Sequence, residues 1–468
     1  MKKLLLLVGV ILFCLSGFAQ DLSFTSPIPV SDANNFKRPR IALVDDHKPV
    51  VLFGGDASKP LYVSRFNGIS FDAPVQITPP NLDPAYAYWM GAEIAAKGQD
   101  VWVIFKAEPE HQHPVYLVHS ADGGITWSDT IKVVGNQPLT RMPEMDLLAD
   151  GTPIVCYMRY DSTNTYPYYY TKQWVTNAWT KPMRLDSLLQ DEACDCCPAE
   201  ILPNADKPMV VYRNNDHNLR EVKLAIQEGS SGYNKIINVD NTAWTLNTCP
   251  SSGPDIVRFK DSLVTIWHGR PTGPANLYIS TIDTTNYAMG YHGSFVDTSA
   301  VQNYPRLSAS DEFIASVHDM RIGSKFRTVV NYSSNSITEF RNQVIKIDSG
   351  SAHQRYPDVI VGGKVAHMVY EDYGTGKIMY RAFAEEGLSL PEKLNLELNI
   401  YPNPSAELIY IQSELDFDQA HIYDLQGKLV SQQLVNEGRI DISSLASGQY
   451  ILSVEFNQSV YQARFNKL

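Results

Sequence analysis

PRIALV, residues 39–44, places a charged residue and an aliphatic one directly after a proline. The same pattern, with or without the proline, returns in six later segments. These segments are GAEIAA (91–96), PEMDLL (143–148), AEILPN (199–204), PDIVRF (254–259), PRLSAS (305–310) and PDVIVG (357–362). Successive charged positions are 51 to 56 residues apart. A repeat of this length, built from short strands, predicts a β-propeller.

Each opening segment is followed by a hydrophobic strand, such as PVVLFG (49–54) and VWVIFK (101–106), and leaves room for two more strands. Long amphipathic helical stretches are absent from the sequence. We therefore predict an all-β fold with seven blades, and a ring of six blades with one irregular unit is the alternative. The segment LSFTSPIPV (22–30) is expected to close the ring by adding a strand to the last blade.

The first strand of each propeller blade lines the central channel. Side chains alternate along a strand, so one member of each charged–aliphatic pair faces the channel and the other faces the blade core. The predicted channel ring consists of Arg40, Glu93, Glu144, Glu200, Asp255, Arg306 and Asp358. Two interpretations compete. The ring is either a structural lining of mutually paired charges, or a catalytic site in which crowding raises one carboxyl pKa and creates a general acid.

Bulk properties restrict the compartment and the partners. Residues 1–19 carry two lysines, an apolar run and a small-x-small ending, which predicts a signal peptide and a mature chain starting at Gln20. The formal net charge is −12, and no run rich in Lys or Arg occurs. This argues against nucleic acid and against an anionic membrane surface as partners.

Five cysteines follow the signal peptide, and four of them are predicted to meet at one end of the channel: Cys194, Cys196, Cys197 and Cys249. An exported protein meets oxidising conditions, so we predict disulfides here rather than a zinc or copper site, and no cofactor. Cys249 is expected to pair with Cys194, leaving a vicinal Cys196–Cys197 bond, or with Cys196 or Cys197. Cys156 is expected to be a buried free thiol.

The stretch SADGGITW (120–127) has the form Ser-x-Asp-x-Gly-x-Thr-Trp. It resembles the Asp box of sialidase-like (BNR-repeat) propellers. In this motif the aspartate accepts hydrogen bonds from a hairpin turn, glycine permits a positive φ, and tryptophan fills the blade core. The predicted structural residues are Ser120, Asp122, Gly124, Thr126 and Trp127. The motif indicates the fold and not an activity.

The resemblance to sialidase-like propellers covers residues 20–392. CDCCP (194–198), VVYRN (210–214) and CPSSGP (249–254) are similar to a bacterial branch labelled exo-α-sialidase. The resemblance implies arginines that bind a substrate carboxylate, an aspartate acid/base, and a tyrosine nucleophile. The candidate binding residues are Arg38, Arg141, Arg355, Tyr304, Tyr356 and Trp89. Further candidate arginines are Arg213, Arg270 and Arg321. The candidate acid is Asp45 or Asp56. Arg38 departs from the family pattern, because Arg-Pro-Arg-Ile replaces Arg-Ile-Pro.

The composition changes after a predicted linker at 393–398, and alternating apolar residues in 399–468 predict a small β-sandwich. YPNP (401–404), IYDLQGKLV (422–430) and LASGQYIL (445–452) resemble the type A C-terminal (Por) sorting domain of the type IX secretion system. That resemblance implies passage across the outer membrane by this machinery, followed by release or surface attachment. An Ig-like adhesive module is the alternative.

Two functions are compatible with these features. The first is a glycoside hydrolase acting on extracellular glycans, and the second is a non-catalytic, monomeric propeller that binds a glycan or a protein. A mostly acidic ring repels an anionic sugar, so we expect sialic acid not to be the ligand.

Overall fold

A computed structural model describes residues 22–468 with short gaps. The residues left out are 1–21, 55–59, 190–191, 204–207, 230–231, 272–273, 296–298, 343, 348–351, 386–395, 414–416, 425–427, 437 and 457–458. The predicted signal peptide, residues 1–19, lies outside the described residues.

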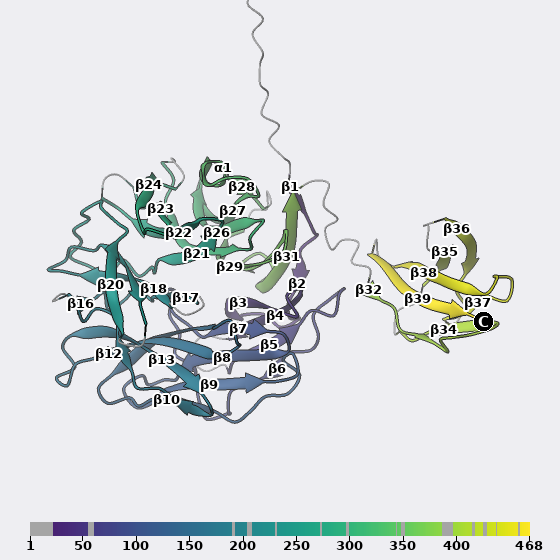
Figure 1. The fold of residues 1–468 in the computed structure, drawn as a ribbon, viewed down its shortest axis with the longest axis horizontal. Coiled ribbons are helices and arrows are strands. Elements are labelled where there is room, and N and C mark those ends of the chain that lie inside the picture. Colours follow the sequence, from purple (N-terminus) through teal and green to yellow (C-terminus); the bar gives the residue numbers. More distant parts are fainter. Residues whose placement is uncertain are drawn as a thin grey trace, which may run out of the picture.

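The described residues from Leu22 to Glu385 form seven antiparallel sheets of four or five strands, one for each sequence repeat. Figure 1 shows the sheets around a common centre, with their first strands near the centre and their last strands at the periphery. One helix occurs in the described part of the chain, α1 (Ile337–Asn342). The predicted all-β propeller is therefore confirmed.

The strands of the seven sheets have the following bounds. The first strands are β3 (Lys37–Val44), β7 (Glu93–Lys97), β11 (Thr140–Leu147), β17 (Glu200–Leu202), β21 (Asp255–Phe259), β25 (Gln302–Ala309) and β29 (Gln354–Gly362). The second are β4 (Lys48–Gly54), β8 (Asp100–Lys106), β12 (Pro153–Tyr160), β18 (Met209–Asn215), β22 (Ser262–Gly269), β26 (Ile314–Ile322) and β30 (Val365–Asp372). The third are β5 (Tyr62–Arg65), β9 (Val115–Ser120), β13 (Pro167–Val175), β19 (Val222–Gln227), β23 (Asn276–Asp283), β27 (Lys325–Ser333) and β31 (Lys377–Glu385). The outer strands are β6 (Val75–Gln76), β10 (Ile131–Val134), β14 (Ala178–Trp179), β15 (Met183–Arg184), β20 (Tyr233–Asn238), β24 (Met289–Ser294) and β28 (Ile345–Lys346), and β16 (Glu192–Ala193) pairs with β18.

The hydrophobic core lies between neighbouring sheets. Val50 and Leu52 of β4 pack in one cluster with Val101 and Val103 of β8, and all four side chains are buried. A sheet covered on both faces needs apolar residues in succession rather than in strict alternation. This explains the unbroken hydrophobic run of each second strand.

The ring is closed by the N-terminal segment, as predicted. β1 (Leu22–Phe24) and β2 (Ile28–Pro29) both pair with β31, so strands from the two ends of the propeller share one sheet. Between them, the Thr25 hydroxyl accepts a hydrogen bond from the Ala382 backbone N–H at 2.8 Å. The closure therefore depends on main-chain pairing and on one buried side chain.

The SADGGITW turn, which follows β9, is held by its own side chains. Asp122 accepts hydrogen bonds from the Ser120 hydroxyl at 2.7 Å, and from the hydroxyl of Thr126 at 2.6 Å. Gly124 has φ of 89°, and Trp127 donates to its carbonyl at 3.2 Å. The indole of Trp127 packs against the cluster between the first two sheets. These contacts give the motif a structural role in the hairpin.

The tail forms two sheets, of five and three strands, around a core of its own (Figure 1, yellow-green). Leu398, which the sequence places in the linker, is buried in that core. The strands are β32 (Leu396–Glu397), β33 (Ile400–Tyr401), β34 (Leu408–Ile411), β35 (Gln419–Asp424), β36 (Leu429–Leu434), β37 (Arg439–Asp441), β38 (Gly448–Phe456) and β39 (Ser459–Lys467).

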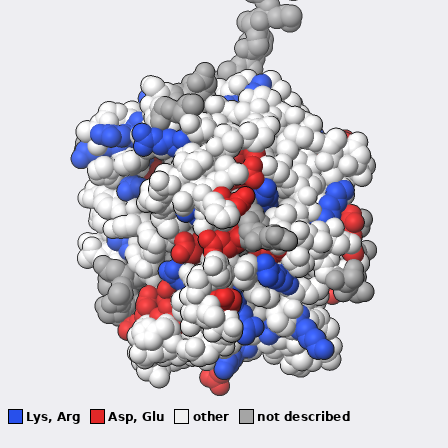
Figure 2. All heavy atoms as spheres, turned by 90° about the vertical axis from the view of Figure 1, so that its left-hand side faces the viewer, with Lys and Arg blue, Asp and Glu red and all other residues white. Residues whose placement is uncertain are grey.

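Within the described residues, no helix has the length and apolar character needed to cross a membrane. On the face shown in Figure 2, acidic side chains gather near the middle, and basic side chains form several separate groups. That face carries no continuous basic stripe of the kind that binds a phosphate backbone.

The closure contact can be tested by Thr25→Val, which keeps the shape of the side chain and removes the hydroxyl. The buried N–H of Ala382 loses its acceptor, so we expect the free energy of unfolding to fall by about 1–3 kcal/mol. Urea unfolding of the mature chain measures this change. Ser23→Ala in β1 is the matched control and is expected to have little effect; equal losses in both variants would contradict the role of Thr25.

Candidate functional site

The first strand of four sheets begins with a β-bulge. Register shifts occur between Lys37 and Arg40, and at the equivalent places in β11, β25 and β29. In each bulge a residue with φ near +50° precedes a proline, which lacks an N–H for the ladder. These residues are Arg38, Met142, Tyr304 and Tyr356, each two positions before a ring charge. The bulges thus form a second tier of side chains above the ring.

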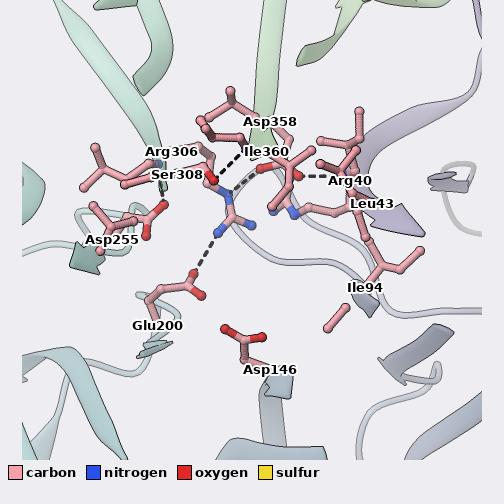
Figure 3. A pocket seen from close by; sticks show the side chains of 18 of the residues that line it. Arg40, Leu43, Ile94, Asp146, Glu200, Asp255, Arg306, Ser308, Asp358 and Ile360 are labelled. Carbon is pink, nitrogen blue, oxygen red and sulfur yellow. Dashed lines mark hydrogen bonds and ion pairs between the residues drawn. The ribbon is translucent and has the colours of Figure 1, made fainter. Parts of the chain in front are cut away.

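All seven predicted ring residues line one cavity, with a volume of about 630 Å³. They come from the seven first strands, and Figure 3 shows several of their side chains directed into it. Asp146, two residues after Glu144 on β11, also lines the cavity and was missed by the sequence analysis. The alternation of side chains along β11 was the signal that would have found it.

Arg306 is the centre of the ring (Figure 3). Its guanidinium contacts Glu93 at 2.9 Å, Glu200 at 2.8 Å and Asp358 at 3.5 Å. Arg40 binds the Glu93 carboxylate through two nitrogens, one of them at 2.9 Å. One arginine therefore links carboxylates from the second, fourth and seventh sheets.

Two ring carboxylates also bond to the backbone of the next sheet. Asp358 accepts a hydrogen bond from the N–H of Ile41 at 2.9 Å, and Asp255 accepts one from the N–H of Leu307 at 2.8 Å. The first of these contacts joins the last sheet to the first. Many of the ring charges are therefore paired with one another or with the backbone.

The ring carboxyls differ in acidity. Burial raises the pKa of Glu93, but the charges of Arg40 and Arg306 outweigh burial, and the net pKa is lowered. Burial, followed by the charges of Glu200 and Glu93, raises the pKa of Glu144 well above its ordinary value.

Two further carboxyls have raised pKa values. Burial, followed by the charge of Asp255, raises the pKa of Glu200 well above its ordinary value, although Arg306 opposes the shift. Burial raises the pKa of Asp255 to about 6 against the charge of Arg306. Glu144 and Glu200 thus hold their protons to higher pH than free glutamate. The ring is less negative than its composition suggests, which weakens the expectation that it repels an anionic ligand.

A smaller cavity of about 40 Å³ lies at the start of the first strands. We call this end the mouth. Arg38, Trp89, Tyr304 and Tyr356 line this cavity together with ring residues that include Glu93 and Glu144. The structure therefore brings four of the six predicted binding residues to one place, directly above the ring.

Arg38 is buried at the mouth. Its Nη1 donates to the Tyr88 carbonyl at 2.7 Å, and its Nε has no hydrogen-bond partner in the described part of the chain. None of the ion pairs among described residues involves the Arg38 side chain. Burial and the nearby charge of Arg40 lower its pKa to about 10. Arg38 is therefore a buried cation whose side chain has no carboxylate partner among the described residues.

Aromatic rings surround this cation. Tyr88 stacks on Tyr356 with centroids 5.6 Å apart and planes 12° apart, and Tyr304 lies 5.0 Å from Tyr356. The side chain of Tyr88 is 54% exposed. Sequence analysis missed Tyr88, although YAYW (86–89) concentrates aromatic residues beside Trp89.

Arg141 and Arg355 do not line either cavity. Arg141 pairs with Glu110 and Arg355 with Asp319, each at 2.9 Å. Their charges are neutralised within the protein, so the implied three-arginine clamp does not assemble here around Arg38.

The structure places one of the two proposed aspartate acids, Asp45, away from the mouth. Asp45 lies in the turn after β3, at the strand's other end from Arg38, where it accepts a hydrogen bond from Gln99. Asp56 falls outside the described residues.

The cysteines converge, and one pair is joined. Cys196 and Cys249 form a disulfide, whereas Cys194, Cys197 and Cys156 are free and buried. The vicinal Cys196–Cys197 bond is therefore a wrong expectation. The disulfide links the loops before β17 and β21, which approach closely: a Cβ at Gly253 would lie 2.5 Å from the Pro198 carbonyl.

Two groups of described side chains have the donor types and proximity to hold a metal, and one of them, Asp195 with Cys196 and Cys249, includes both sulfurs of the disulfide. The sulfur atoms of Cys194, Cys196 and Cys197 all lie within 4.8 Å of one another.

Comparison with known proteins identifies the tail. Residues 399–467 match the model of the secretion system C-terminal sorting domain. This segment is a C-terminal sorting domain. The sorting domain indicates export by the type IX secretion system to the cell surface or the extracellular space, and implies an interaction with that machinery. No curated protein matches the chain.

Solved propeller structures resemble the chain only in fold. The GH93 α-L-arabinofuranosidase of Fusarium graminearum, solved with arabinobiose, is 13% identical, with a TM-score of 0.43 over 77% of this chain and 98% of that one. Trypanosoma rangeli sialidase, solved with the inhibitor DANA, is 11% identical, with a TM-score of 0.42 over 94% and 89%. The polysaccharide lyase Uly1 is 9% identical, with a TM-score of 0.47 over 76% and 90%. These values carry no conclusion about activity.

The raised pKa of Glu144 predicts a pH effect on stability. The folded state holds the Glu144 proton more tightly than the unfolded state, so the stability it contributes is complete below the unfolded pKa and is lost as pH rises through the folded pKa. Glu144→Gln removes this loss. We expect the variant to match the wild type near pH 4 and to become relatively more stable toward pH 8, by up to about 1.4 kcal/mol per pH unit.

Urea unfolding at several pH values measures this difference. The exposed Glu312→Gln, whose carboxylate pairs with Lys364 at the surface, is the control and is expected to show no such trend. A constant difference between wild type and Glu144→Gln across the range would contradict the buried protonated state.

Proposed function

We propose that the propeller binds an extracellular carbohydrate at its mouth. The faces of one or two sugar rings lie against Tyr88 and its aromatic neighbours, and Arg38 donates hydrogen bonds to an oxygen of the ligand.

The observation that carries this proposal is the buried guanidinium of Arg38 inside an aromatic rim, which has no ion-pair partner and an unsatisfied Nε among the described residues. A buried donor without an acceptor costs free energy that a ligand oxygen recovers. The rim offers flat apolar faces, and Tyr and Trp add polar groups at their edges; the indole N–H of Trp89 also has no partner among the described residues. Binding sites of this kind combine apolar walls with a few convergent polar groups.

The size of the mouth decides where the ligand sits. A cavity of about 40 Å³ holds a few water molecules but not a sugar ring. The sugar therefore rests on the rim, and only a substituent such as a hydroxyl or carboxylate reaches toward Arg38. Export through the sorting domain brings the mouth into contact with extracellular and cell-surface glycans.

Binding can be tested with the mature chain on an array of neutral and uronate-containing oligosaccharides, followed by calorimetry. Tyr88→Ala is expected to weaken binding about tenfold or more, which corresponds to about 1.4 kcal/mol. Tyr166→Ala is the matched control, because Tyr166 is similarly exposed but does not belong to the group of rings formed by Tyr88, Tyr356 and Tyr304. Arg38→Met is expected to weaken binding more than Arg258→Met at the far end of the channel. Equal affinity of Tyr88→Ala and Tyr166→Ala for the carbohydrate would show that the aromatic rim does not bind it.

A second candidate function is hydrolysis of the bound glycan. The specific observation in its favour is the opposite shift of two neighbouring carboxyl pKa values, lowered for Glu93 and raised for Glu144, beside one cavity. Opposed shifts of this kind separate an acid from a base in glycosidases. Glu93, however, is engaged by both Arg40 and Arg306, which leaves it little freedom to act as a nucleophile.

Hydrolysis can be tested with a panel of fluorogenic glycosides, including a sialoside and neutral sugars. If the second function holds, Glu144→Gln should lose at least a hundredfold in turnover, the range for loss of a general acid. Glu312→Gln should be unaffected. Binding on the array without turnover on any glycoside would leave the protein a non-catalytic glycan-binding propeller.

A further inference from the structure

The CDCC turn carries two free thiols in direct contact. The N–H of Cys197 donates to the Cys194 carbonyl at 3.3 Å, which closes a turn just before β17. The turn places the two sulfurs 3.4 Å apart, and both side chains are fully buried. Cys196, between them in sequence, is already engaged by Cys249.

Two buried arginines face this thiol pair. Arg220 donates through Nη1 to the Cys194 sulfur at 3.4 Å. Arg213 donates to the carbonyls of Arg220 and His268 at 3.0 and 2.6 Å, and its Nε has no partner among the described residues. No ion pair joins either arginine to a carboxylate in the described chain, which omits 190–191. The charge of Arg220 acts on Glu192, whose side chain accepts a hydrogen bond from Asn215.

Buried cations require a nearby negative charge. The sulfur of Cys197 is the group best placed to supply it. This sulfur is fully buried and lies 3.4 Å from the Cys194 sulfur, to which Arg220 donates. The pocket therefore favours an anionic sulfur cluster over a neutral one.

We propose that Cys194 and Cys197 form a binding site for one soft monovalent metal ion, Cu(I). Binding replaces the two thiol protons by two copper–sulfur bonds, releases two H⁺ and changes no oxidation state. The product carries one net negative charge from two thiolates and one Cu⁺.

The net negative charge of the Cu(I) bis-thiolate distinguishes it from a disulfide and from a zinc complex. A Cys194–Cys197 disulfide is neutral, and it would leave Arg213 and Arg220 without a counter-charge. Zn²⁺ with two thiolates is also neutral and lacks two of its usual four ligands. Cu(I) prefers soft sulfur donors and needs few of them. Its anionic bis-thiolate is the state that the two arginines stabilise.

The surroundings of the thiols are soft and dry. Met142 belongs to the same buried cluster, and the Tyr169 hydroxyl contacts both the Met142 sulfur at 3.7 Å and the Cys197 carbonyl at 2.5 Å. Thioether sulfur is a further ligand type that Cu(I) accepts. Burial suits a bound ion better than a reactive thiol, because reactive thiols are partly exposed.

The mature chain, kept anaerobic, tests the site. Thiol titration of the unfolded chain is expected to give three thiols, with Cys196–Cys249 intact. Cu(I) supplied as its coloured bicinchoninate complex should then transfer to the folded protein at one equivalent and produce a sulfur-to-copper absorption band in the ultraviolet. Cys194→Ser and Cys197→Ser should each abolish transfer and band. Cys156→Ala removes the remaining free thiol, which is buried in the same cluster but is not one of the grouped sulfurs, and should keep both.

Arg220→Gln tests whether the positive charge of Arg220, in addition to the closeness of the two sulfurs, supports Cu(I) binding. Loss of this neighbour is expected to weaken Cu(I) binding by roughly 10- to 100-fold, the usual range for groups that support metal ligands. Circular dichroism confirms that each variant is folded.

Three results would overturn the proposal. A count of one thiol would show a second disulfide, Cys194–Cys197. Unchanged transfer in the Cys194→Ser variant would place copper elsewhere. One equivalent of bound zinc together with five thiols would show a four-thiolate site that includes Cys196 and Cys249.

Discussion

The position of Arg306 at the centre of the channel is the constraint on which the propeller depends. Seven first strands converge on one axis, and each brings a largely buried charged side chain into the channel. Unpaired charges there would be costly, so the ring must neutralise itself. Arg306 does this by contacting carboxylates from three sheets, and Arg40 completes the neutralisation of Glu93. Ion pairs across the axis thus hold together sheets that are not joined by a main-chain ladder.

The same strand geometry builds the ligand face. A bulge and a proline start four of the first strands, and three of the four bulge residues line the mouth. Arg38 and Tyr356 reach the mouth in this way, while Tyr88 arrives from a connecting loop. The raised pKa values of Glu144 and Glu200 reduce the negative charge of the ring below Arg38. The paired charges of the ring and the aromatic rim above it therefore both result from the way the first strand of each sequence repeat begins.

Much of the fold follows from spacing in the sequence. The recurrence of PRIALV-like segments predicted the sheets and the membership of the ring, because strand alternation is a local property. The ring-closing role of residues 22–30 and the sorting domain also followed from local patterns. Local pattern did not predict that Arg141 and Arg355 would be neutralised, since Glu110 and Asp319 lie 31 and 36 residues away and come close only in the folded chain. It also left the partner of Cys249 open.

By itself, the sequence determined the all-β class, the seven charged positions and the C-terminal sorting domain, because each is encoded by periodicity or by a contiguous motif. Only the tertiary structure decided which of those charges are paired, which carboxyls keep a proton, and which arginine at the mouth remains available. It also decided that Cys196 joins Cys249 and that two thiols face two arginines. The physical reason is the same in each case. Burial and charge pairing depend on distances between residues of different sheets, and only closing the ring sets those distances.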